Sequence, residues 1–269
     1  MMNSMEREIG FPLILRNNKG ISLTTEGKKL LPFIRSLVRA NTALEEEFSC
    51  IRGGNAGMVR IGSFPTTAYA WIPEILRRLH ESYPGINVEV MEDNNINLLS
   101  QWLSQGIVDL AFFSRQSQFN FHWINLRPDP FVVLLPKNHI LSKRDTVPVS
   151  KLAQEKVVLF RYHEGADPDT YNWLNQTGIQ FNSSFTSNSD FTSIRVVEQN
   201  DYVAVMPELI ARFAVVSHNV TYRPLDIKAS REIGIAVRDR EQLSPAAKIF
   251  LKFAKDSIAI TQCHSKYAV

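Results

Sequence analysis

The sequence has no apolar stretch long enough to cross a membrane. Apolar runs such as Phe131–Leu135 have the length of a β-strand, whereas a membrane-spanning helix needs about 20 apolar residues. Glu6, Arg7 and Glu8 interrupt the N-terminal residues, so the chain does not begin like a secretory signal peptide. We therefore expect a cytoplasmic protein.

Cysteine is scarce, and metal-binding spacings are missing. Cys50 and Cys263 are the only cysteines, so they can build neither a disulfide scaffold nor a zinc site. We interpret them as inert thiols, with a redox switch between them as the alternative. His163 and Glu164 have no nucleophile or metal motif beside them, and the other histidines do not approach a paired-ligand spacing. The sequence therefore predicts no metal, no cofactor and no enzymatic activity.

The net charge is only +3, but the positive charge is concentrated at the front of the chain. Residues 1–40 hold seven basic and three acidic side chains, a difference of +4. Because Lys and Arg neutralise phosphates, a basic leader on a nearly neutral body favours a segment that faces nucleic acid. A solvated charged surface is the alternative.

Two short apolar segments near the N-terminus predict a β-hairpin. Leu13–Arg16 and Ile21–Leu23 flank the polar residues 17–20, in which Asn and Gly accept the positive φ of a tight turn. A hairpin this short needs a packing partner. The preceding Met5–Ile9 is the expected last turn of a helix that ends at Gly10.

A long helix is predicted from an N-cap at Thr24 to about Arg52. Its apolar positions alternate four and three apart, which is the spacing of a helix that pairs with another chain, and one polar residue in such a seam fixes register. A helix packed on its own domain is the alternative. The positions expected in the dimer seam are Leu30, Ile34, Leu37, Asn41, Leu44 and Phe48.

From Met58 onwards strand-like and helix-like segments alternate in two series, one from 59 to 113 and one from 131 to 206. Such alternation favours parallel strands joined by right-handed crossovers. The sequence thus predicts an α/β fold made of two similar units, followed by a strand over Glu232–Val237 and a helix from Ser244.

A series of short motifs, in order over nearly the whole chain, resembles the LysR-type transcriptional regulators. The motifs in the front part are Glu8–Arg16 and Leu23–Gly27. Those in the body are Val59–Gly62, Ile72-Pro73, Tyr83-Pro84, Leu103–Ala111, Asp129–His139, Val203–Pro207 and Leu243–Ala247.

The resemblance implies a winged helix-turn-helix, a dimerising linker helix, and an effector domain of two lobes shaped like a periplasmic solute-binding protein. We expect the partial winged helix-turn-helix in residues 1–24 and the linker helix with its hinge in 25–56. Lobe 1 is expected in 57–127 plus 225–260, and lobe 2 in 128–224. In this family another helix and most of the recognition helix precede the segment like Met5–Gly10. We therefore expect a front truncated by a misassigned start or by loss.

Effector contacts are expected where strands end, in the cleft between the lobes. The loop from Ser63 opens a helix and offers hydroxyls and backbone N–H groups to an anion, and Thr66 matches the family's effector-binding Ser or Thr. Arg161 could pair with a carboxylate. Ordinary caps, turns and exposed charges are the alternative for these positions. The remaining candidates for effector contact are Thr67, Asn94, Asn95, Phe113, Ser114, Tyr162, Ser189 and Asp190, and those for DNA contact are Arg7, Arg16 and Lys19.

The resulting hypothesis is an allosteric regulator. A small carboxylate or other polar metabolite would close the cleft, and an oligomer of the chain would then change its grip on DNA. Two alternatives stay open: a small-solute-binding module, and a truncated oligomerisation partner that does not bind specific DNA sequences.

Overall fold

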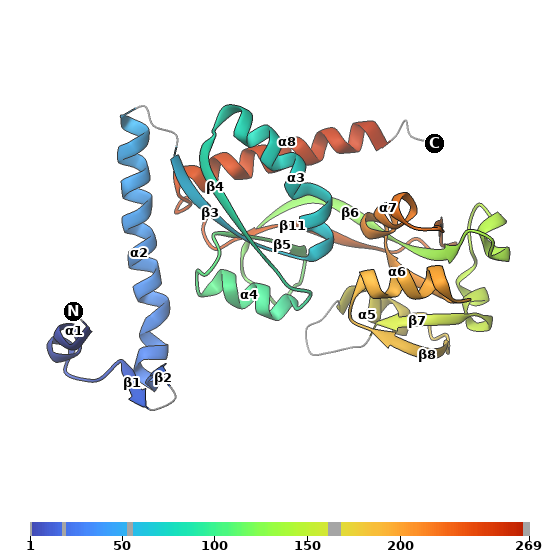
Figure 1. The fold of residues 1–269 in the computed structure, drawn as a ribbon, viewed down its shortest axis with the longest axis horizontal. Helices are drawn as coiled ribbons and strands as arrows, with labels where there is room; N and C mark the ends of the chain where they lie inside the picture. Colours follow the sequence, from blue (N-terminus) through green and yellow to red (C-terminus); the bar gives the residue numbers. More distant parts are fainter. Residues whose placement is uncertain (1, 18–19, 53–55, 161–167, 266–269) are drawn as a thin grey trace.

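The computed structural model describes residues 2–17, 20–52, 56–160 and 168–265 (Figure 1). The helices are α1 Met2–Ile9, α2 Thr25–Ile51, α3 Pro65–Ser82, α4 Ile96–Ser104, α5 Pro168–Gln176, α6 Asp190–Gln199, α7 Glu208–Ser217 and α8 Pro245–Ser265, with 3-10 turns at Ile140–Lys143 and Val149–Gln154. The strands are β1 Ile14–Asn17, β2 Gly20–Leu23, β3 Ala56–Ser63, β4 Gly85–Glu92, β5 Leu110–Ser114, β6 His122–Pro136, β7 Lys156–Phe160, β8 Asn182–Ser187, β9 Val203–Pro207, β10 Val220–Pro224 and β11 Ser230–Val237.

The N-terminal part is a helix, a hairpin and the start of the long helix, as the sequence predicts. Gly10 has a φ of +85° after α1, and β1 pairs antiparallel with β2. The Glu6 carboxylate ties the two parts together by accepting the Leu13 and Ile14 N–H groups at 2.6 and 3.0 Å. The Thr24 hydroxyl accepts the N–H of Gly27 at 2.9 Å, which is the expected N-cap of α2.

Lobe 1 is a sheet with helices on both faces. Parallel β3, β4 and β5 are followed by antiparallel β11, and side chains alternate between the two faces. Leu110 and Phe112 of β5 face α3 and α8, whereas Ala111 and Phe113 face α4. This alternation explains why β5 is buried along its whole length.

Lobe 2 repeats the plan around parallel β7, β8 and β9. Val132 and Leu134 of β6 pack with α6 and α7 on one face, while Val133 and Leu135 pack with α5 and the two 3-10 turns on the other. Helix α7 also meets lobe 1, because the Tyr69 ring of α3 lies 4.3 Å, edge to face, from the Phe213 ring of α7.

One strand serves both lobes. The first part of β6 pairs with β11 as far as Pro130, and from Phe131 it pairs with β9 and β10. The chain crosses to lobe 2 along this strand and returns between Pro224 and Ser230. Both lobes therefore share one sheet, in the order β4-β3-β5-β11-β6-β9-β7-β8, with β10 also on β6.

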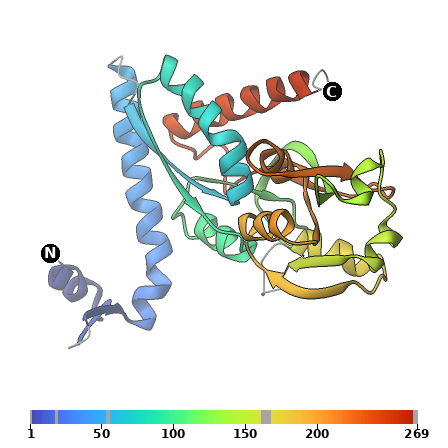
Figure 2. The same ribbon diagram turned by 45° about the vertical axis from the view of Figure 1, so that its right-hand side comes forward.

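Helix α2 lies along lobe 1, away from lobe 2, and carries the hairpin and α1 at its far end (Figures 1 and 2). Glu46 is its buried anchor, with 6% of its surface exposed. One carboxylate oxygen accepts the Met58 N–H of β3 at 3.1 Å, and the other accepts the Ala246 N–H in the first turn of α8 at 3.4 Å. Gly57 is required beside this contact, because a Cβ there would lie 2.7 Å from the Ala246 Cβ.

The opposite face of α2 is apolar and has no cover within the described chain. Leu37 is 73% exposed and Ile51 is 75% exposed, and Phe33, Leu44 and Phe48 are also exposed. Leu30 and Ile34 are partly covered, and Asn41 is exposed with its amide donating to Glu45 on the next turn. A single chain thus leaves most of the predicted seam in water.

The main differences from the predicted elements lie near the crossover. A short strand was expected at Phe131–Leu135, but β6 begins nine residues earlier, at His122, and runs through Pro128 and Pro130. Helix α7 and strand β10 were not predicted at all. No helix in the described ranges is long and apolar enough to span a membrane.

Candidate functional site

The first turn of α3 presents polar groups at the junction of the lobes. Thr66 and Thr67 follow Pro65, which fits the first helical position because it has no N–H to leave unpaired. Within the described residues, the Thr66 and Thr67 N–H groups find no hydrogen-bond acceptor, as is usual for a first turn. The Thr66 hydroxyl accepts a hydrogen bond from Nη2 of Arg231 at 3.1 Å.

Arg231 and Asp129 form a buried ion pair beneath Thr66. They face each other across β11 and β6, with Nε and Nη2 of Arg231 donating to one Asp129 oxygen at 3.1 and 3.0 Å. Arg231 is 5% exposed and Asp129 is fully buried. The second Asp129 oxygen accepts the Leu209 N–H of α7 at 3.0 Å. The guanidinium also lies 5.5 Å from the centre of the Phe64 ring.

Burial and the hydrogen-bond partners act in opposite directions on the pKa of the Asp129 carboxyl. Burial raises the pKa of the Asp129 carboxyl above its ordinary value, and the adjacent Arg231 guanidinium opposes that rise. Two charged hydrogen bonds and a backbone N–H favour the ionised form. A carboxylate so deeply buried is tolerable only with such partners.

Other side chains join the lobes directly. The Asn94 amide, after β4, donates to the Asn188 carbonyl after β8 at 3.2 Å. Gln116, after β5, donates from Nε2 to the Ser114 hydroxyl at 3.2 Å and to the Asp169 carboxylate of α5 at 3.1 Å. We call these polar residues, together with Thr66, Arg231 and Asp129, the interlobe site. Its predicted members are Thr66, Asn94 and Ser114; its members not predicted from sequence are Gln116, Asp129, Asp169, Asn188 and Arg231.

The other predicted contacts in the described chain have local roles. The Thr67 hydroxyl bonds to Ser63 and to the Phe64 carbonyl, within the same turn. Asn95 caps α4, and Ser189 caps α6. The Phe113 ring is buried with Phe119 and Trp123 under α4, and Asp190 is buried in the first turn of α6.

Several expectations fall on residues outside the described part. These are the effector contacts Arg161 and Tyr162, the DNA contact Lys19, the His163-Glu164 pair, and the side chains of both cysteines, Cys50 and Cys263. The two described DNA candidates, Arg7 on α1 and Arg16 on β1, are exposed at the far end of α2.

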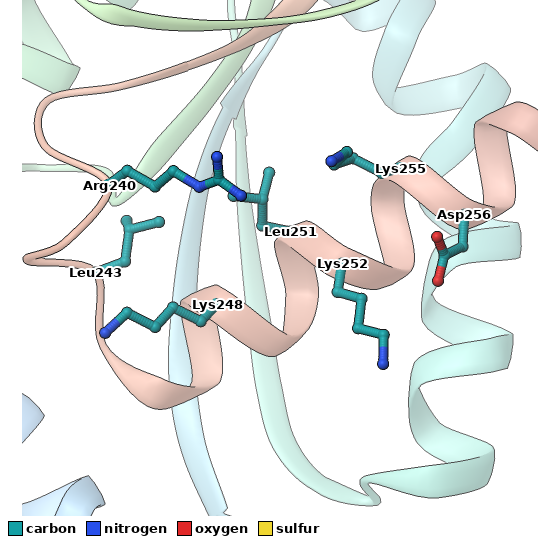
Figure 3. A pocket seen from close by; sticks show the side chains of 7 residues that line it. All are labelled: Arg240, Leu243, Lys248, Leu251, Lys252, Lys255 and Asp256. Carbon is teal, nitrogen blue, oxygen red and sulfur yellow. The ribbon is translucent and has the colours of Figure 1, made fainter.

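A hollow of about 400 Å³ lies beside α8 (Figure 3). Lys248, Lys252 and Lys255 project from α8, with Arg240 on the preceding loop and a buried apolar floor that includes Leu251. None of the four cations is ion-paired with a described residue. Asp256 is the one acidic residue among the described residues of this lining, so the surface is mainly electropositive. It contains none of the predicted effector contacts.

Metal-ligand clusters of three or more His, Cys, Asp or Glu side chains are absent from the described ranges. The groups of the interlobe site are hydroxyls, amides, one guanidinium and carboxylates. Such a set binds polar molecules through hydrogen bonds and charge.

The family model described as the LysR substrate binding domain matches residues 52–259. The chain belongs to the LysR family. The LysR match covers both lobes and the strands that join them, so the two-lobed effector domain predicted from the sequence is confirmed.

Curated LysR relatives are transcriptional regulators by name. The uncharacterized HTH-type regulator YvbU of Bacillus subtilis is 24% identical over 256 residues, covering 95% of this chain and 86% of that protein. The HTH-type regulator BudR of Raoultella terrigena is 26% identical, covering 92% of this chain and 86% of that protein. These relatives are named as regulators and not as enzymes.

Solved LysR structures share the fold. A full-length OxyR variant from Pseudomonas aeruginosa superposes with a TM-score of 0.74 at 20% identity, covering 95% of this chain and 85% of that one. The effector-binding domain of QuiR in complex with shikimate gives 0.65 at 21% identity, covering 75% of this chain and 96% of that one.

Proposed function

We propose that this chain is a transcriptional regulator whose effector domain binds a small organic anion, a carboxylate above all, at the interlobe site. Occupancy would alter how an oligomer of the chain holds DNA through its N-terminal part. We expect it to act in the cytoplasm, where that DNA lies. The observation that carries the proposal is the set of donors in the first turn of α3, at the junction of the lobes.

The hydrogen-bond directions at Thr66 favour an acceptor as ligand. Its hydroxyl already accepts from Arg231, and no described residue takes its own proton. That proton and the Thr66 and Thr67 N–H groups are three donors on one helical turn. An N-terminal turn also carries partial positive charge, so an anionic oxygen is the group that matches it best.

Asp169, which Gln116 joins to lobe 1, supplies an acceptor. Its Oδ1 accepts a hydrogen bond from Gln116, whereas Oδ2 is buried and has no hydrogen-bond partner among the described residues. A buried polar atom of this kind is costly to leave unpaired. A ligand with a hydroxyl or amino group beside its carboxylate would therefore satisfy Asp169 as well.

The N-terminal part supports DNA contact and self-association. Arg7 and Arg16 are exposed beside the hairpin, where they could meet phosphates. The uncovered apolar face of α2 suits a second copy of the helix, because an exposed seam of this length costs free energy in water. The sequence-based limits of the N-terminal part, linker and lobes remain predictions.

A thermal-shift experiment tests the proposal. Wild-type protein is heated with acetate, succinate, citrate, benzoate or shikimate, each at several concentrations, and with succinamide as an uncharged counterpart. A ligand at about 100 times its Kd adds about 2.7 kcal/mol to the stability, which is a clear rise in melting temperature. At least one carboxylate should raise it, and succinamide should not.

Two variants locate the binding. Thr66→Val removes the hydroxyl with little change in shape and should abolish the carboxylate-dependent rise, whereas Thr66→Ser should retain it. Thr42→Val, on α2 and far from the site, is the control and should respond like wild type. Equal responses of Thr66→Val and wild type would place the ligand elsewhere and contradict the proposal.

A further inference from the structure

A continuous chain of hydrogen bonds links Thr66 in lobe 1 to α7 in lobe 2. The Thr66 hydroxyl accepts from Arg231, Arg231 donates to Asp129, and Asp129 accepts the N–H of Leu209. The three heavy-atom distances along it are 3.1, 3.0 and 3.0 Å. All three side chains are buried, and they come from α3, β11 and β6.

We propose that the Arg231–Asp129 pair is the positioning device of the effector site: it orients the Thr66 hydroxyl and transmits the state of that hydroxyl to α7. This inference rests on the proposed function only for the identity of Thr66 as a ligand contact. We call the chain Thr66–Arg231–Asp129–Leu209 the crossover relay.

The relay sits where the two lobes are joined. Asp129 and Arg231 are cross-strand partners, and β6 begins to pair with lobe 2 two residues after Asp129. These are the two strands by which the chain leaves lobe 1 and returns to it. Any rotation of the lobes about this crossover must therefore move the pair or strain it.

Helix α7 is the element of lobe 2 best placed to respond. Its N–H at Leu209 is held by Asp129, and the Leu209 side chain packs against the hydrophobic core of lobe 1. One turn further on, Phe213 meets Tyr69 of α3. A shift of the Asp129 carboxylate thus reaches a helix that already bridges both lobes.

The orientation of the Thr66 proton follows from the same bonds. A guanidinium only donates, so it fixes the threonine oxygen as an acceptor and leaves its proton for a ligand. Burial keeps these charged bonds strong, because water cannot replace them. An anion that draws the Thr66 hydroxyl towards itself would weaken or redirect the hydrogen bond from Arg231. The hydrogen bonds from Arg231 to Asp129 would change with it.

Hydrogen–deuterium exchange at the Leu209 amide tests the relay without any effector. Thr66→Val removes one acceptor of Arg231 Nη2, which also donates to Asp129, and should speed exchange at Leu209 in the other lobe. Mutations along a coupled network change free energies by about 0.5–2 kcal/mol, which corresponds to about 2- to 30-fold in exchange rate. Thr66→Ser keeps the oxygen and should exchange like wild type.

Thr67→Val is the matched control. It removes a buried hydroxyl from the next residue of the same turn, but the bonds of that hydroxyl stay with Ser63 and Phe64. It should leave exchange at Leu209 unchanged. Asp129→Asn, which disturbs the acceptor directly, should speed it at least as much as Thr66→Val.

Exchange at Leu209 that is the same in Thr66→Val as in wild type would overturn the relay, even if Asp129→Asn speeds it. So would equal acceleration by Thr66→Val and Thr67→Val, since that result reports general loosening of α3. Neither outcome depends on carboxylate binding. Failure of the relay is therefore distinguishable from failure of the proposed effector site.

Discussion

Replacing Glu46 by alanine should weaken the attachment of α2 to lobe 1. Glu46 is 6% exposed, and its carboxylate accepts two backbone N–H groups from separate elements, Met58 of β3 and Ala246 of α8. Alanine leaves both donors without that acceptor. The same change removes a negative charge from the N-terminal turn of α8, where it is favourable.

The size of the effect follows from these contacts. An unsatisfied buried donor costs about 1–3 kcal/mol, and the longer bond, at 3.4 Å, belongs at the low end of that range. The sum is about 2–4 kcal/mol. For a chain of this size about 1 kcal/mol shifts the melting temperature by about 2–4 °C, so a fall of about 4–16 °C is expected.

Differential scanning calorimetry of wild type, Glu46→Ala and Glu47→Ala measures it. Glu47 is the next residue, carries the same charge and is exposed, so its replacement should change stability by less than about 0.5 kcal/mol. Glu46→Gln keeps one acceptor oxygen and should fall between the two. If Glu46→Ala and Glu47→Ala melt at the same temperature, Glu46 does not anchor the helix and our account of this junction is wrong.

Two further predictions concern the front of the chain. The double variant Leu37→Asp/Leu44→Asp places charges in the exposed α2 seam and should reduce the mass measured by light scattering to that of a monomer. Ile140→Asp, which changes an exposed apolar residue on lobe 2, is the control and should leave the mass unchanged. A monomeric wild type would refute the role of the seam in self-association. The second concerns the Glu6 carboxyl, whose pKa is lowered by the Leu13 and Ile14 N–H groups. Because this pKa is lowered, the contribution of the Glu6 carboxylate to stability is complete above the ordinary value of 4.5 and is lost as the pH falls through the folded-state pKa. The NMR shifts of the Leu13 and Ile14 amides should therefore titrate in that acid range. In Glu6→Gln they should not.

Much of the fold was predictable because its signals are local. The pairing of β1 with β2, the Thr24 cap and the alternation of strands and helices depend on neighbouring residues, and the structure has them where expected. Strand β6 was predicted too short because Pro128 and Pro130 usually interrupt a strand. Here they stand at the crossover, where β6 exchanges one set of partners for another.

Only the smaller part of the interlobe site has a local signal in the sequence. Thr66 has a local signal, a polar loop that opens a helix after a strand. Asp129 and Arg231 are 102 residues apart in the sequence, and no short-range sequence pattern predicts that they pair. The available hint was a charged residue at the border of each apolar strand, since a buried charge requires a partner. In the same way, nothing local distinguishes Glu46 from Glu45 and Glu47, and only the fold selects which of them is buried.

The place of β11 in the sheet sets the order in which the protein can be completed during synthesis. Strand β5 ends at Ser114, but its neighbour β11 begins only at Ser230. At about 5–20 residues per second, the ribosome needs roughly 6–25 s to supply the missing strand. During that interval lobe 2 can close on its own strands, while lobe 1 waits with an open sheet edge and without α8 over its core. Lobe 1 is therefore the part of the nascent chain most open to wrong pairing with other chains. Most of it is translated before lobe 2, but it is completed after lobe 2.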